Sequence, residues 1–320
     1  MADAPLRVAV TGAAGYLGSG LVRRLEAERL VAGILALDVR PLRDGGPKVR
    51  FVRHDVVEPV AGLLREHAID TVVHLAFVLR PSRRREDTAR VNVGGASRVF
   101  EDCGKAGVRH VVYLSSTTVY GAHPDNPPML TEESPVRPVR GFHYGEDKAD
   151  AERALAECLR RTPGLAATVL RACPVLGPSA DNFVSRAFAR PVLVGAIGRD
   201  PPMQLLHEED LWEVMAACVV RPAPGVYNLA GEGVVRWSEM ARLYGRRMVK
   251  LPGPLLRALT GATWALRLQS ESNAAGLDFI RYRWTVSTER AKRVLGATFR
   301  HTSRQTWESF ASGGGGKAAS

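Results

Sequence analysis

The chain has 320 residues, 45% of them hydrophobic and 24% charged, and its formal net charge is +11 at pH 7. This length and composition predict a cytoplasmic enzyme with a large core, because the longest apolar runs are too short to span a bilayer and the first residues lack a secretory signal. The basic residues are spread along the chain, which favours a solvated surface, so we expect neither nucleic acid nor a membrane as a partner.

The first predicted elements are a strand at Val8–Val10 and an amphipathic helix at Leu17–Leu30, joined by a turn that contains Gly12, Gly15 and Gly18. Glycine lets the backbone approach a phosphate closely, and the free N–H groups at the start of the next helix face an anion. The turn therefore predicts a pyrophosphate site. The glycine spacing is G-x-x-G-x-x-G. The prediction of a pyrophosphate site depends on the position of these glycines directly after the first strand.

The second predicted strand, Gly33–Leu37, ends at Asp38, twenty positions after Gly18. An acidic residue at this position can accept hydrogen bonds from the adenosine ribose hydroxyls and would repel a 2′-phosphate. NAD is therefore favoured over NADP. Arg40 acts against this preference, because a nearby arginine can accommodate the 2′-phosphate.

Further strands at 49–52, 71–75, 110–114 and 167–171 alternate with helical segments at 57–67, 90–106 and 141–161. This alternation predicts an α/β fold with a Rossmann-type, doubly wound parallel sheet. Asp55 follows the third strand, where it can meet an adenine amine or cap a helix. His74 is expected at a strand end near the cofactor. Asn92 lies inside a helix, where it either binds water or backbone in the interior or faces solvent.

Two dense local clusters lie between these elements. Arginines at 80, 83, 84 and 85 crowd one predicted loop, which could meet a phosphate-bearing ligand. Hydroxyl side chains at 115–118 follow the fifth strand, at the edge where open α/β sheets bind ligands. A Pro-rich loop at 124–138 then forms a plausible substrate rim.

Tyr144 and Lys148 are four residues apart on the helix that follows, so they share a face. A lysine ammonium one turn away stabilises a phenolate, and Tyr144 can then serve as a general base or, in reverse, as a general acid. Ser116 would hold the same substrate oxygen, and Lys148 would also bind the nicotinamide ribose.

The residues after Arg171 predict a smaller mixed α/β lobe. Helices are expected at 210–220, 237–247, 254–268 and 288–295, with Ser287 as a cap and Gly296 as a stop, and a strand at 225–229 returns to the main sheet. The domains are therefore a Rossmann domain at 1–171, rejoined by segments near 205–230, a substrate lobe at 172–310 and a disordered tail at 311–320.

Metal and disulfide chemistry is not expected. His207 is expected to support a helix start, because no second metal ligand is suitably spaced. The four cysteines are far apart and form no C-x-x-C pair, so reduced thiols are predicted.

Over roughly residues 6 to 300 the chain resembles the extended short-chain dehydrogenase/reductases, in the NAD-dependent epimerase/dehydratase group, and within it the nucleotide-sugar 4-epimerases. The motifs are T-G-A-A-G-Y-L-G at 11–18, Asp38, Asp55-Val56, H-L-A-F at 74–77, S-S-T-T-V-Y-G at 115–121, Y-G-E-D-K at 144–148 and L-R-A-C-P-V-L-G-P at 170–178.

This resemblance implies an NAD cofactor and catalytic roles for Ser116, Tyr144 and Lys148. It also implies a homodimer in which the helix faces at 90–106 and 144–159 pair. The residues expected at the cofactor are Gly12, Gly15, Tyr16, Leu17, Gly18, Asp38, Asp55, Val56, Leu75, Ala76, Asn92, Tyr144 and Lys148.

Departures from the family pattern concern the substrate. Thr117 and Thr118 stand where the 4,6-dehydratases carry Asp-Glu, so dehydration is not expected. Met203 stands where UDP-galactose 4-epimerases carry a diphosphate-binding arginine, and a later R-P-G-D segment is missing, with residues 281–284 nearby instead. Both differences weaken the case for a UDP-sugar. Other arginines could bind phosphates in their place, namely Arg186, Arg190, Arg199 or those of the loop around Arg83.

The sequence thus predicts an NAD-dependent enzyme that oxidises a secondary alcohol of a small-molecule substrate, with epimerisation of a nucleotide sugar as the favoured outcome. The alternative is dehydrogenation or reduction of a non-nucleotide alcohol or ketone. A third hypothesis is a cofactor-binding sensor without chemistry. The intact Ser116, Tyr144 and Lys148 argue against the sensor, which needs none of them.

Overall fold

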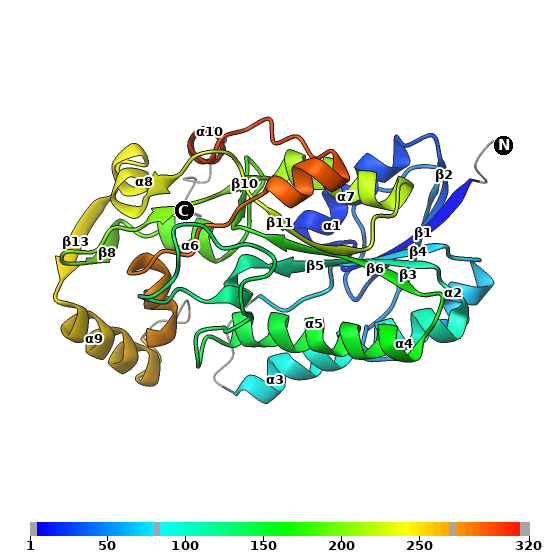
Figure 1. Cartoon of the computed structure of the whole chain (residues 1–320), viewed down its shortest axis with the longest axis horizontal. Helices are drawn as coiled ribbons and strands as arrows, with labels where there is room; N and C mark the ends of the chain where they lie inside the picture. The colour runs from blue at the N-terminus through cyan, green and yellow to red at the C-terminus, as the bar shows by residue number, and fades with distance from the viewer. Residues whose placement is uncertain (1–4, 80–83, 269–272, 314–320) are drawn as a thin grey trace.

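Seven parallel strands form the main sheet of the computed structural model, which describes residues 5–79, 84–268 and 273–313 (Figure 1). Their order across the sheet is β11-β6-β5-β4-β1-β2-β3. The strands are β1 Leu6–Thr11, β2 Val31–Asp38, β3 Val49–Arg53, β4 Thr71–His74, β5 His110–Ser116, β6 Ala166–Ala172 and β11 Gly225–Leu229. The predicted doubly wound sheet is confirmed, and β11 is the predicted returning strand, paired with β6.

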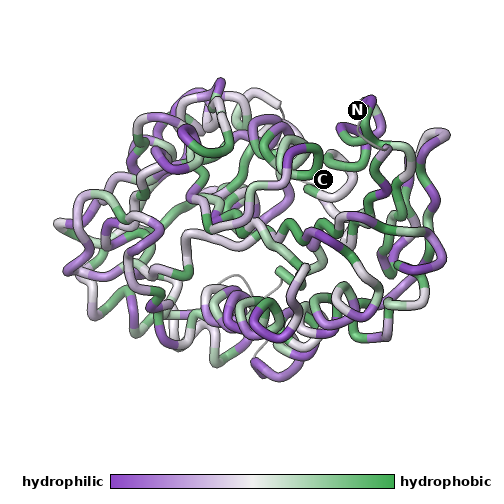
Figure 2. Tube along the Cα trace, turned by 45° about the vertical axis from the view of Figure 1, so that its right-hand side comes forward, coloured by the Kyte–Doolittle hydropathy of each residue, from purple (hydrophilic) through white to green (hydrophobic). Residues whose placement is uncertain are grey.

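Helices cover both faces of this sheet, which explains why its central strands are apolar on both sides. On one face lie α1 (Tyr16–Glu26) and α7 (Glu208–Val220), and on the other lie α2 (Ala61–Glu66), α4 (Ala96–Ala106) and α5 (His143–Arg161) (Figure 1). Figure 2 shows hydrophobic stretches along the strands of the sheet. Because the strands are parallel, their carboxyl ends lie at one edge of the sheet, together with the predicted site residues.

The contact between α1 and α7 depends on a glycine. A Cβ atom on Gly20 would lie 2.1 Å from the indole ring of Trp212, and the Trp212 Nε1–H donates a hydrogen bond to the Leu17 carbonyl at 3.0 Å. The start of the first helix is therefore fixed by a residue almost 200 positions away in sequence.

The C-terminal part of the chain combines short strands with small helices around a second, aromatic core. Phe188, Trp237, Trp307 and Phe310 pack together there. The elements are β7 Val175–Leu176, α6 Phe183–Phe188, β8 Val192–Ala196, β9 Pro202–Met203, β10 Leu206–His207, β12 Val235–Arg236, α8 Trp237–Leu243, β13 Arg247–Leu251, α9 Gly253–Ala265, η3 Ala274–Ile280, η4 Ala291–Leu295 and α10 Ser303–Ser312.

Several predicted helix boundaries are wrong. The first helix ends at Glu26 and not at Leu30. The helix predicted at 90–106 is longer, because α3 (Arg85–Ala89) and a wide π-helical turn, η1 (Arg90–Gly95), precede α4. The helix predicted at 237–247 ends at Leu243, because Gly245 adopts a φ of +67° and the chain then enters β13.

The last described helix, α10, was not predicted. Thr302 and Gln305 form a capping box at its start, in which each side chain binds the other residue's backbone N–H. Residues 311 and 312, expected in a disordered tail, are the end of this helix, and 314–320 lie outside the described residues. The stop at Gly296 is confirmed by its φ of +65°. The division at residue 171 stays a prediction.

Candidate active site

The turn between β1 and α1 can be built only with glycine. Gly12 has a φ of +70°, and a Cβ atom there would lie 2.7 Å from the backbone nitrogen of Ala76. A Cβ atom on Gly18 would lie 2.1 Å from the Gly12 carbonyl oxygen, and one on Gly15 would lie 3.1 Å from the same atom. The helix therefore begins directly against the turn, with the amide N–H groups of its first turn available to an anion.

Asp38 closes this turn from the end of β2. One carboxylate oxygen accepts a hydrogen bond from the Ala14 N–H at 3.0 Å, and the other accepts one from the Arg40 N–H at 2.9 Å. The Arg40 side chain is largely exposed, with its Nε 3.7 Å from Asp38, and its guanidinium lies beside Gly15. Both the acid and the arginine considered in the sequence are therefore at the turn.

The loop after β4 is held against the glycine-rich turn. Thr11 Oγ1 accepts hydrogen bonds from the N–H groups of Leu75 at 3.3 Å and Ala76 at 3.4 Å, and it also pairs with the ring of the buried His74. Asn92 fixes the far end of this loop, because its amide oxygen accepts from the Val78 N–H at 2.7 Å. Asn92 is thus buried and binds backbone, which confirms the first of its two predicted placements.

Asp55 and Val56 lie in the loop after β3. Asp55 does not cap a helix, since its carboxylate accepts from the Val57 N–H at 3.2 Å and α2 begins only at Ala61. Val56 is buried and packs against Gly95, where an added Cβ atom would come within 2.7 Å of it. Cofactor contacts by these residues stay predictions.

Ser116, Tyr144 and Lys148 are brought together where β5 ends beside α5. The phenol of Tyr144 lies close enough to the Ser116 hydroxyl for that hydroxyl to influence its pKa, and the Ser116 hydroxyl accepts a hydrogen bond from the Thr118 N–H at 3.2 Å. Lys148 Nζ donates to the carbonyl of Leu114 at 2.6 Å. The sheet edge and one helix face therefore place a hydroxyl, a phenol and an amine at a single point.

The surroundings change the acidity of both ionisable groups. Burial raises the pKa of Tyr144, and the nearby Ser116 hydroxyl acts against that rise. Burial lowers the pKa of Lys148 to about 7, while the carboxylates of Glu152 and Asp147 act in the opposite direction. The Lys148 ammonium also lies 4.1 Å from the centre of the Phe77 ring. A negative charge that develops beside this lysine would stabilise its protonated form.

Aromatic rings from three segments surround Tyr144. Their centroids lie 5.2 Å away for Phe77, 6.0 Å for Phe142 and 6.4 Å for Phe183. Phe77 follows β4, Phe142 precedes α5, and Phe183 begins α6 in the C-terminal part. Tyr144 therefore lies where the sheet edge meets the smaller lobe.

Sequence reasoning missed two acidic residues that support the site. The buried Glu208 at the start of α7 accepts hydrogen bonds from the Tyr16 phenol and, at 2.8 Å, from the Ser179 hydroxyl. The buried Asp147 accepts from the Asn92 amide at 3.0 Å and contacts Arg85 at 3.3 Å. The partners of both carboxylates are distant in sequence. The only local signal for Glu208 and Asp147 is that each is an acidic residue in an otherwise buried helix segment.

The residues considered as diphosphate ligands lie in different surroundings. Met203 is buried in β9 and is part of the second core. Arg199 lies over the ring of Tyr282, and Arg186 contacts Asp181 at 3.1 Å. The loop that includes Arg80 and Arg83 lies outside the described residues.

His207 has a partner that its sequence neighbourhood did not reveal. The ring of His301 stacks on it with 3.8 Å between centroids, and Glu209 approaches both. The His207 ring nitrogens already pair with the Ser309 hydroxyl and the Glu209 N–H. The predicted support of a helix start is confirmed, because His207 is the N-cap of α7.

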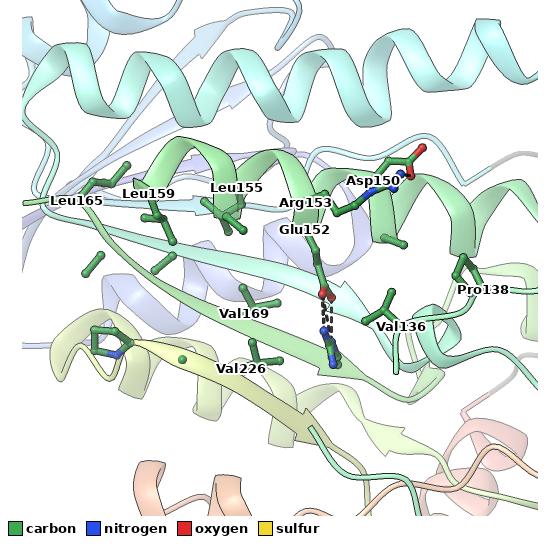
Figure 3. Close-up of a pocket in the computed structure, with 17 residues that line it drawn as sticks. Val136, Pro138, Asp150, Glu152, Arg153, Leu155, Leu159, Leu165, Val169 and Val226 are labelled. Carbon is green, nitrogen blue, oxygen red and sulfur yellow. Dashed lines mark hydrogen bonds and ion pairs between the residues drawn. The ribbon is translucent and has the colours of Figure 1, made fainter. Parts of the chain in front are cut away.

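A groove of about 850 Å³ runs along the other side of α5 (Figure 3). Its walls come from α5, β6 and β11, and the Glu152–Arg171 ion pair crosses it. The lining residues include Leu155, Leu159, Leu165, Val169 and Val226. None of the predicted catalytic or cofactor residues lines this groove, so it is distinct from the candidate active site.

The chain is similar in sequence and fold to several known proteins. A sequence model of the NAD dependent epimerase/dehydratase family matches residues 8–230. An uncharacterized protein of Mycobacterium tuberculosis is 32% identical over 97% of this chain and 85% of its own length. A UDP-glucose 4-epimerase of Mycolicibacterium smegmatis is 37% identical over 44% of this chain and 48% of its own. The solved structure of MoeE5 in complex with UDP-glucuronic acid and NAD is 28% identical, with a TM-score of 0.75 over 96% of this chain and 98% of that one.

Proposed function

Because the chain belongs to the NAD-dependent epimerase/dehydratase family, we propose that it binds NAD and oxidises a secondary alcohol of a nucleotide sugar, with Tyr144 as the general acid and base. The observation that carries the proposal is the grouping of Ser116, Tyr144 and Lys148 at the edge of the sheet that also holds the glycine-rich turn. A cofactor-binding sensor would not need this grouping.

The residues at the turn fit NAD. Added Cβ atoms at positions 12, 15 and 18 would press against neighbouring backbone atoms. With glycine at these positions, the backbone of the turn carries no side chain where a pyrophosphate would approach. Tyr16, Leu17 and Gly18 form the first turn of α1 and would offer N–H groups to it. Asp38 and Asn92, with the loop at Leu75 and Ala76, complete the proposed cofactor surface.

The chain's own residues would handle the proton. NAD, when bound, supplies the hydride acceptor. Tyr144 would take the proton from the substrate hydroxyl and return it later, while Ser116 holds the same oxygen through a hydrogen bond. Lys148 would stabilise the phenolate by its positive charge, and its hydrogen bond to Leu114 fixes the direction of its side chain.

Epimerisation is the outcome we favour for this chemistry. The support is the likeness to MoeE5, solved with UDP-glucuronic acid and NAD, and to a UDP-glucose 4-epimerase. Met203, in place of an arginine at a diphosphate, is the observation against a UDP-sugar. The alternative is net dehydrogenation or reduction of a non-nucleotide substrate. We also propose a homodimer through α4 and α5.

A test of turnover with a trace of NAD separates the two outcomes. Purified protein is screened against sugar nucleotides and simple alcohols, and both NADH absorbance and product stereochemistry are followed. We expect an epimer to form from a sugar nucleotide without accumulation of NADH, because the hydride returns to the same substrate. Product that appears only in step with NADH would establish the dehydrogenase alternative.

Cofactor preference is tested at the end of β2. We expect Asp38→Ser to weaken NAD binding and to shift the ratio of the NAD and NADP dissociation constants toward NADP, because the carboxylate that repels a 2′-phosphate is gone while Arg40 remains. Titration calorimetry with both cofactors measures the ratio. Asp38→Ser combined with Arg40→Ala should reverse the gain in NADP affinity. An unchanged ratio would show that Asp38 does not contact the ribose.

A further inference from the structure

Helix α9 exposes its apolar side chains. Leu255 and Leu259 are each 47% exposed and Leu266 is 69% exposed, whereas Leu256 is the buried residue of this helix. Positions 255, 259, 262 and 266 follow helical spacing, so the three leucines and Ala262 form one stripe on the solvent side. We refer to these four residues as the α9 stripe. A helix that buries so little and exposes leucine points to a binding surface.

The neighbouring strands extend this apolar surface. β8 and β13 pair in parallel, with Val194 opposite Val249, and both side chains are exposed. Ile197, directly after β8, is 59% exposed. α9 follows β13 after a single residue, so the stripe and the strand surface belong to the same end of the molecule (Figure 1).

Basic residues predominate around this surface. Residues 240–268 contain no Asp or Glu and six basic residues, which are Arg242, Arg246, Arg247, Lys250, Arg257 and Arg267. Arg257 is neutralised by Asp278 at 2.6 Å. Arg247 shares one face of β13 with Val249, is exposed, and forms no ion pair within the part of the chain that the structure describes. Exposed leucines and valines beside an unpaired cation match the chemistry of an anionic lipid surface.

We propose that the α9 stripe and the adjoining face of β8 and β13 bind a membrane surface that carries anionic lipid headgroups. The helix would lie in the headgroup region, with its leucines toward the acyl chains and Arg247 toward the headgroups. No described helix is long and apolar enough to cross a bilayer, so the contact is peripheral. This proposal departs from the sequence-based expectation of no membrane partner, which rested on the absence of a spanning segment and not on exposed surface.

Vesicle flotation tests the proposal with the full chain. Vesicles of equal parts phosphatidylcholine and phosphatidylglycerol are compared with vesicles of phosphatidylcholine alone. We expect the protein to float with the anionic vesicles and to be released by high salt. Leu259→Gln with Leu266→Gln should weaken binding more than about 10-fold, since both leucines enter the acyl region. Arg247→Gln should weaken it by about 5-fold, since it removes one charge from the proposed surface.

A matched control distinguishes binding through the α9 stripe from non-specific hydrophobic binding. Val294 is 50% exposed and lies beside two basic residues on another surface, so Val294→Gln should float as the original chain does. Thermal unfolding confirms that each variant is folded. Equal flotation with the neutral vesicles, or full binding by the leucine variant, would overturn the proposal. Light scattering that shows a dimer lost only in the leucine variant would also overturn it, because the stripe would then join two copies of the chain.

Discussion

Tyr144→Phe is expected to reduce kcat by about 10²- to 10⁴-fold while the dissociation constant for NAD changes little. The substitution removes the phenol hydroxyl beside Ser116, and with it the proposed proton carrier. It keeps the ring, whose contacts with Phe77, Phe142 and Phe183 are shared by phenylalanine. Steady-state kinetics on the identified substrate, together with NAD titration, measures the two effects separately.

The control for this variant is another tyrosine whose hydroxyl has no proposed role. Tyr244 lies in the second core against Trp307 and Phe310, and its buried hydroxyl has no hydrogen-bond partner in the described residues. Tyr244→Phe should therefore leave kcat unchanged. If Tyr144→Phe retained more than about a hundredth of the original kcat, Tyr144 would not be the acid and base. Loss of NAD binding in the same variant would instead point to structural damage.

The main sheet could be predicted from sequence because its signals are local. The run Val8–Val10, the glycines after it and the Asp38 that ends the next strand lie within about forty residues of one another. The central strands β4 and β5 are fully buried and read as short apolar runs, and most of the connections in the sheet contain a helix with its own period. The same alternation places the proposed site residues at the ends of successive strands.

The smaller lobe could not be predicted in the same way. Its strands β9 and β12 are two residues long and pair Met203 with Val235, so neither shows a periodic pattern of its own. β13 is not predicted: its first residue, Arg247, is placed at the end of a predicted helix, residues 248–251 are assigned to no element, and only the pairing with β8 makes this segment a strand. Here long-range pairing decides local structure.

The same contrast between local signals and long-range contacts applies within the site. The glycines and the pair of Tyr144 and Lys148 were found by spacing, since their geometry depends on neighbours in one turn or one helix. The link from Tyr16 to Glu208 spans 192 residues and gives no local signal. This contact joins the glycine-rich turn to the start of α7, so the support of the candidate site depends on the complete fold.

Gly18→Ala is expected to weaken NAD binding more than about 100-fold and to lower the melting temperature. The added Cβ atom would lie 2.1 Å from the Gly12 carbonyl oxygen and 2.8 Å from the Ala13 Cα, and both are backbone atoms that cannot rotate away. The start of α1 must therefore move from the turn, and the N–H groups proposed to face the pyrophosphate move with it. Overpacking of this kind costs about 1–3 kcal/mol of unfolding free energy. NAD titration and thermal unfolding of the same sample measure both effects.

Gly62→Ala is the matched control for this substitution, because it adds the same methyl group to a glycine in another helix that packs against the sheet. Gly62 lies in α2 and has no atom within 4 Å of its added Cβ position. Alanine there should leave NAD affinity unchanged and raise stability by up to about 1 kcal/mol, since it favours the helix. If Gly18→Ala bound NAD as tightly as Gly62→Ala does, the close approach of α1 to the glycine turn would not be what binds the cofactor.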